Sequence, residues 1–268
     1  MYAIKNIKNY YDEGFSICTK KMLEFEPGVT VLVGCNGIGK TTTLNIIADH
    51  CSRNDIPYIH YDNLEKGNSH GLSSAFFYGD YGLVSTLMSS SEGERITLNF
   101  GQEVKYMHDF IVTGKKKNSA RFEALRDALS DHKMKEKDVP KERFILLDGI
   151  DSGASIDCVL ELKSAFKLML EDAKKNNVEL FIVISANEYE LVDGSQCMDV
   201  TKGEYIYFDS YEAYKKFILK TRKIKTKRYE RLEKRAKKRQ EKEEQEKEAE
   251  FQDQDKWKSP RIKGKEVK

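Results

Sequence analysis

The residues best able to do chemistry lie in one glycine-rich stretch, 34–41, which reads Gly-Cys-Asn-Gly-Ile-Gly-Lys-Thr. The stretch satisfies the pattern G-x-x-x-x-G-K-[ST], and it stands between an apolar run and a helical pattern. The glycines let backbone N–H groups face phosphates, Lys40 can reach the β and γ oxygens, and the Thr41 hydroxyl can coordinate Mg²⁺. The stretch therefore predicts a P-loop that binds ATP and Mg²⁺.

A second candidate is Asp148, which ends the apolar run 143–148. An acid at the end of a buried strand can hold Mg²⁺ through a water molecule beside a P-loop. The alternative is an acid that only caps the following loop. Given the P-loop, we expect Asp148 to be the Walker B acid, so that the predicted metal residues are Thr41 and Asp148.

These motifs, with the serine-glycine segment 90–95, resemble ABC-class ATPases of the SMC-like, RecF-like and DNA-repair kind. The resemblance covers residues 1 to about 215 and fits a compact prophage-type or bacterial form without a coiled coil. It implies that Ser91 and Gly93 contact the γ-phosphate held by the opposite protomer, in an ATP-dependent head-to-tail homodimer. The alternative for this segment is an ordinary helix cap. The resemblance implies a nucleotide-binding set of Gly34, Asn36, Gly37, Gly39, Lys40, Thr41, Thr42, Ser91 and Gly93.

The chain departs from the family pattern after Asp148. Gly149 stands where the family usually places a catalytic glutamate, and Asn187 stands at the switch position, which is usually histidine. Asp151 follows in the D-loop region and carries a carboxylate that could replace the missing base. The catalytic candidates are thus Asp148, Asp151 and Asn187, and we expect either a slow ATPase or a non-hydrolysing, ATP-gated clamp.

Other family positions have weaker counterparts. Glutamine is absent from 35–94, so Asn63 is the candidate for the Q-loop position. The upstream aromatic residues are candidates to stack on adenine, although core packing is an alternative for at least two of them. They are Tyr10, Tyr11 and Phe15.

The expected elements follow from periodicity. Apolar runs at 29–33, 143–148 and 178–185 predict buried strands, and helical patterns cover 40–50 and the region after 156. Strand, helix and strand in succession predict a parallel sheet. Further strands are expected at 2–7, 15–25 and 58–61, and a helix at 92–112. The predicted fold is an α/β P-loop NTPase of ABC type, with a mostly parallel sheet flanked by helices and antiparallel N-terminal strands.

Charge divides the chain. The segment 220–268 holds 20 Lys/Arg and 11 Asp/Glu, whereas the whole chain has a net charge of only +2. We therefore expect an ATP-binding domain over 1–215 and a charged, helical or disordered extension over 216–268. The basic run 220–239 could meet nucleic acid, or it could be a solvated helix that the following acidic block masks.

Composition limits the remaining possibilities. No apolar stretch is long enough for a membrane span, and the five cysteines show no metal-binding spacing. We expect a cytoplasmic protein with no membrane segment and with reduced thiols. Its partners would be a second copy and DNA, in repair, recombination or phage DNA metabolism, or else a protein. A transporter ATPase subunit is less favoured, because its signature would more usually read LSGGQ.

Overall fold

The computed structural model describes residues 1–6, 18–63, 104, 106–114, 140–152 and 154–258, with side chains up to residue 246. The chain divides into two units, Met1–Arg222 and Lys223–Lys268. All strands and most helices of the described part belong to the first unit.

The first unit is built on a six-stranded sheet with the order β4-β5-β6-β3-β7-β8. The first five strands in this order are parallel, and β8 runs antiparallel to β7. A separate antiparallel pair joins β1 to β2. The strand bounds are β1 Tyr2–Lys5, β2 Met22–Phe25, β3 Gly28–Val33, β4 Tyr58–Asp62, β5 Glu142–Asp148, β6 Glu179–Ser185, β7 Gln196–Asp199 and β8 Glu204–Ile206. The predicted α/β class, with a mostly parallel sheet and an antiparallel N-terminal pair, is confirmed.

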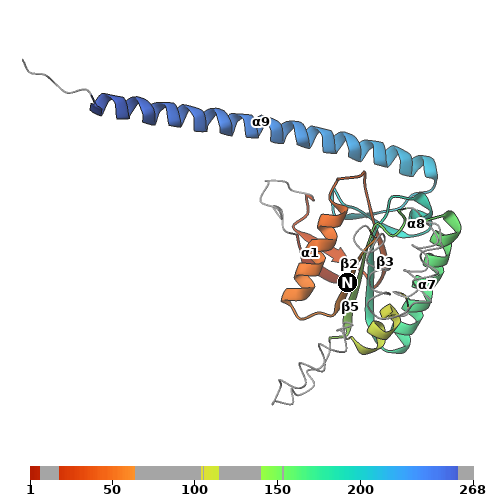
Figure 1. Cartoon of the computed structure of the whole chain (residues 1–268). Helices are drawn as coiled ribbons and strands as arrows, with labels where there is room; N and C mark the ends of the chain where they lie inside the picture. The colour runs from red at the N-terminus through yellow and green to blue at the C-terminus, as the bar shows by residue number, and fades with distance from the viewer. Residues whose placement is uncertain (7–17, 64–103, 105, 115–139, 153, 259–268) are drawn as a thin grey trace, which may run out of the picture. The chain divides into compact units, whose positions relative to one another are not determined.

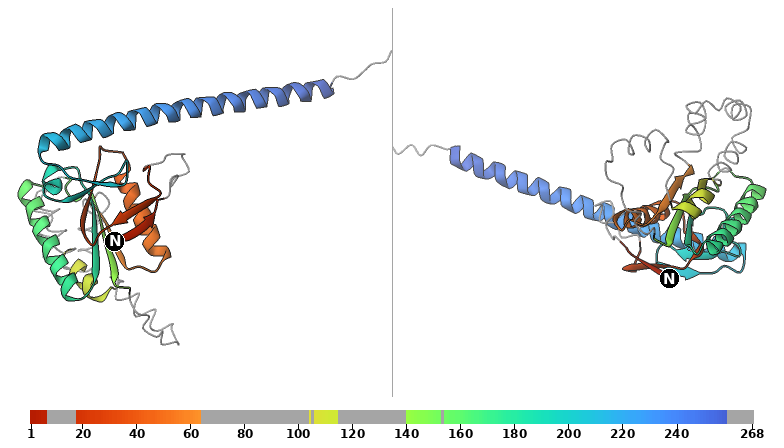
Figure 2. Two further views of the ribbon diagram at one scale, coloured as in Figure 1. Left: turned by 180° about the vertical axis from the view of Figure 1, so that it is seen from behind. Right: turned by 90° about the horizontal axis from the view of Figure 1, so that it is seen from below.

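Helices cover both faces of this sheet. Figures 1 and 2 show α1 (Lys40–Arg53) and α7 (Ile156–Lys175) on opposite sides of the strands. Side chains alternate along β3 accordingly. Leu32 packs in the core beneath α1, whereas Val31 and Val33 pack in the core beneath α7. Both faces are buried, which explains why the central strands are almost wholly apolar.

The strand order decides which loops meet. Strand β6 lies between β3 and β5, and the chain then crosses β3 to form β7 on its other side. The carboxyl ends of parallel strands meet at one edge of the sheet, and ligands of open α/β sheets commonly bind at that edge. The loops after β3, β5 and β6 therefore lie together. Lys40 directly follows the first of these loops as the first residue of α1, and the other two loops contain Gly149 and Asn187.

Most expected elements are present, with some differences. The strand predicted over 15–25 is shorter, because in its described part only Met22–Phe25 is a strand. Strands β7 and β8 were not predicted. The helix predicted over 92–112 is helical at 106–112, and most of its remainder lies outside the described residues.

The helix α9 (Tyr211–Lys258) continues from the first unit into the second. The extension is therefore helical as far as Lys258, and most of its described side chains from Lys223 to Glu246 are exposed. Within the described part of the chain, no helix is both long and apolar enough to cross a membrane.

Candidate phosphate-binding site

The loop 34–41 connects the end of β3 to the start of α1. Gly39 has a φ of 114° where the helix begins, a conformation that favours glycine. Gly34 has a φ of 150°, and a Cβ added there would come within 2.8 Å of Ile38 Cγ2. A side chain at either position would therefore strain the backbone, and one at Gly34 would also clash with Ile38.

Lys40 is the central cation of the loop. Its side chain is buried although it belongs to the first turn of α1, with an exposed fraction of 8%. The Lys40 ammonium donates to the Gly34 carbonyl at 2.9 Å and to Asn187 Oδ1 at 3.0 Å. Burial lowers the pKa of Lys40, while the nearby Asp151 carboxylate opposes that shift. Because an ammonium has three hydrogens, these two bonds leave it able to donate to an anion.

The N-terminus of α1 has further features of an anion site. No acidic residue lies in its first turn, so its backbone N–H groups and helix dipole favour negative charge there. The Thr43 hydroxyl turns back to the Gly39 carbonyl at 2.9 Å. The side chain of Thr41 is exposed, as is that of Asn36, and Thr42 is half-buried.

Asp148 ends β5 and is held from the neighbouring strand. Ser185 lies at the end of β6, and its hydroxyl donates to the Asp148 carboxylate. The hydroxyl oxygen of Ser185 also accepts the Gly149 N–H at 3.0 Å. Asp148 is buried, and its charge acts on Lys40. Ser185 was missed by the sequence analysis. Its signal was a polar residue that ends an apolar run, as Asp148 does.

Asp151 is the most buried acid near the site, with an exposed fraction of 1%. Its Oδ2 accepts the backbone N–H groups of Asn187 at 2.5 Å and of Glu188 at 2.7 Å. Its Oδ1 has no hydrogen-bond partner among the described residues. The carboxylate therefore fixes the turn after β6, which favours a positioning role. Its role as a replacement base stays a prediction.

Asn63, the candidate for the Q-loop position, lies beside the loop that follows β5. Its amide nitrogen donates to the Gly149 carbonyl at 3.1 Å and to the Ser152 carbonyl at 3.4 Å. Gly149 itself has a φ of 63°, in the left-handed region. Asn63 thus supports the loop that begins at Gly149, where the resemblance to ABC-class ATPases predicts a catalytic base.

Two residues of α9 also reach the site, and neither was predicted. The Tyr214 hydroxyl donates to the Asn187 carbonyl at 3.1 Å, and Thr221 Oγ accepts the Cys35 N–H at 3.0 Å. Both belong to the first unit. Of the other sequence candidates, Tyr10, Tyr11, Phe15, Ser91 and Gly93 lie outside the described residues.

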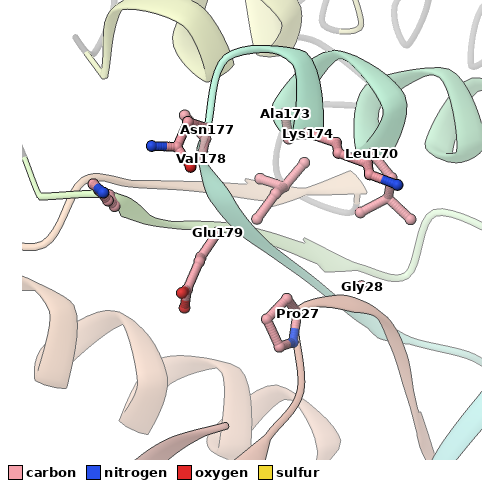
Figure 3. Close-up of a pocket in the computed structure, with 10 residues that line it drawn as sticks. Pro27, Gly28, Leu170, Ala173, Lys174, Asn177, Val178 and Glu179 are labelled. Carbon is pink, nitrogen blue, oxygen red and sulfur yellow. The ribbon is translucent and has the colours of Figure 1, made fainter.

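A pocket of about 420 Å³ lies at the opposite end of the sheet, where β3 and β6 begin and α7 ends (Figure 3). Its lining mixes apolar atoms with exposed charges of both signs, including those of Lys141, Lys174 and Glu179. It shares no residue with the loop 34–41. The pocket and the cluster of polar groups around Lys40 are therefore two separate sites at opposite ends of the sheet.

Comparison with known proteins gives no match, either to a family model or to a curated sequence. The likeness to ABC-class ATPases therefore rests on the motifs of the chain itself. In the described part, the chain brings together Lys40, Asp148, Asp151 and Asn187 at one edge of a parallel sheet.

Proposed function

We propose that this chain binds Mg-ATP at the loop 34–41 and is a P-loop NTPase of the ABC type. The observation that carries the proposal is the buried ammonium of Lys40 at the start of α1. Burying a cation is costly unless an anion or hydrogen-bond acceptors offset the loss of water. A triphosphate would provide that anion, beside a helix N-terminus that already favours negative charge.

The residues present fit a magnesium ion. The exposed Thr41 hydroxyl and the Asp148 carboxylate are hard oxygen groups, and Mg²⁺ usually takes only one or two protein ligands beside phosphate and water. When bound, the ion would neutralise charge on the phosphate oxygens. Ser185 fixes the Asp148 carboxylate through its hydroxyl, so the acid is oriented before any ligand arrives.

The residues that follow Asp148 support slow hydrolysis. Gly149 has no side chain that could accept a proton from the attacking water, and Asp151 already accepts two backbone N–H groups. A general base contributes about 10²–10⁴-fold, so turnover should fall well below the common median of about 10 s⁻¹. We therefore favour a nucleotide-gated switch that hydrolyses ATP slowly.

The homodimer and the DNA contact remain parts of the proposal that rest on the sequence. The dimer depends on Ser91 and Gly93, which the resemblance to ABC-class ATPases predicts to act in trans. A DNA contact depends on the basic run 220–239, whose charges would meet phosphates without reading sequence. The exposure of most described side chains in this run favours such a contact.

The test is nucleotide binding by isothermal titration calorimetry, with and without Mg²⁺. The wild-type protein should bind ATP, and Lys40→Ala should lose most of the affinity. Lys167→Ala removes an exposed lysine on α7 and is the matched control. If the wild-type protein did not bind ATP, or if Lys40→Ala bound it equally well, the proposal would fail.

A further inference from the structure

The first turns of α9 contact the proposed nucleotide site at two separate points. Thr221 Oγ accepts the Cys35 N–H at 3.0 Å, and the Tyr214 hydroxyl donates to the Asn187 carbonyl at 3.1 Å. Cys35 belongs to the loop 34–41, and Asn187 Oδ1 accepts from Lys40. One helix thus holds both the loop and the residue that contacts its lysine.

The hydrogen bond from the Cys35 N–H to Thr221 involves a buried side chain whose orientation is fixed. Thr221 is 1% exposed, and its hydroxyl also donates to the Ile218 carbonyl at 2.8 Å. That bond orients the hydroxyl, so that a lone pair faces the Cys35 N–H. A backbone N–H buried without a partner is costly, so this loop conformation depends on the acceptor that α9 supplies.

The contact at Tyr214 is fixed by packing. Its ring lies 5.7 Å from the ring of Tyr189 and 5.4 Å from that of Phe208, measured between centroids. Burial and the nearby Asp151 carboxylate raise the pKa of Tyr214, so its hydroxyl stays protonated and can donate. The turn 187–188 is therefore held from two sides, by Asp151 and by α9.

We infer that Thr221 and Tyr214 are positioning residues that couple nucleotide occupancy to the docking of the first turns of α9, Tyr211–Arg222. This inference rests on the proposed function. If the α9 contacts favour the binding-competent loop, bound nucleotide must favour those contacts by the same factor, because coupling between two equilibria is reciprocal. Since α9 runs on unbroken to Lys258, its first turns link the site to the basic segment.

The first test removes each contact separately. Thr221→Val keeps the shape of the side chain and loses the acceptor, and Tyr214→Phe loses only the hydroxyl. Each variant should lower ATP affinity about 3- to 10-fold, which is the range expected for a single hydrogen bond. Thr221→Ser restores the hydroxyl and should restore the affinity.

Matched controls separate this coupling from general damage to the fold. Ser164→Ala on α7 removes a similar hydrogen bond from a side chain to its own helix, and Tyr211→Phe removes an exposed hydroxyl at the start of α9. Both should bind ATP as the wild type does. Equal losses in the controls, or a failure of Thr221→Ser to rescue, would overturn the inference.

Hydrogen exchange measures the reverse direction. ATP should slow exchange in peptides covering 211–222 by about twofold or more, and the effect should shrink in Thr221→Val. If ATP sped exchange there, phosphate would be competing with Thr221 for the Cys35 N–H, and the inferred sign would be wrong. If the wild type bound ATP and Lys40→Ala did not, while exchange at 211–222 stayed unchanged, the inference would fail and the proposed function would stand.

Discussion

The two ends of the six-stranded sheet use polar side chains in opposite ways. At the carboxyl end, buried groups from several elements bond to one another, as Asp151 does with the turn after β6. At the amino end, Lys141, Lys174 and Glu179 are exposed around a pocket of about 420 Å³. Convergent buried polar groups, which are costly to assemble, therefore mark the candidate site better than cavity size does.

A carboxylate at each end gives the largest expected contrast. Asp148→Asn should lower Mg²⁺-dependent ATP turnover roughly 100-fold, because the charge that balances the metal is lost. Glu179→Gln removes a carboxylate beside the pocket at the amino end, and it should change turnover by less than about twofold. Steady-state phosphate release by both variants measures the contrast, and similar losses would mean that the two ends are not functionally distinct.

Gly149, where the proposed ATPase would carry its catalytic base, offers the next contrast. Gly149→Glu should raise turnover about tenfold if the lack of a carboxylate limits hydrolysis. The left-handed φ of 63° strains any side chain at this position by about 1–2 kcal/mol. Gly149→Ala therefore serves as the control, since it carries the strain without the carboxylate. A rise in both variants, or in neither, would remove the missing base as the explanation.

Asp151 tests how much the carboxyl end depends on its buried bonds. Asp151→Ala leaves two backbone N–H groups without their acceptor and should lower the free energy of unfolding by about 2–4 kcal/mol. Glu171→Ala, on the exposed surface of α7, should change it little. Chemical denaturation of both variants provides the comparison. A loss of turnover without a loss of stability would instead support Asp151 as the base.

The smallest effect concerns pH. Burial lowers the pKa of Lys40 in the folded protein, so between that value and the ordinary lysine value of 10.5 the unfolded chain binds the extra proton. Stability contributed by Lys40 should therefore rise with pH across this window. The difference in unfolding free energy between wild type and Lys40→Met measures the effect, with the exposed Lys167→Met as control. A difference that fell with rising pH would contradict the burial of the ammonium.

The sequence by itself determined the parts of the molecule that local pattern encodes. The apolar runs gave β3, β5 and β6, because strands buried on both faces need apolar side chains throughout. The glycines and Lys40 of the loop 34–41 could be recognised as a motif from the sequence, because their spacing follows from local steric and electrostatic requirements. Asp148 was chosen as a candidate from the sequence because it ends such a strand.

Only the tertiary structure decided which distant residues support the site. Ser185, Tyr214 and Thr221 have no motif, and each matters through a partner far away in the chain. The short strands β7 and β8 were also not predicted, because the strand conformation of a run of a few residues depends on packing against neighbouring strands. Asp151 shows the same limit. Its carboxylate predicted a replacement base from the sequence, which stays a prediction, whereas its contacts with two backbone N–H groups follow only from the strand order that brings those groups within reach.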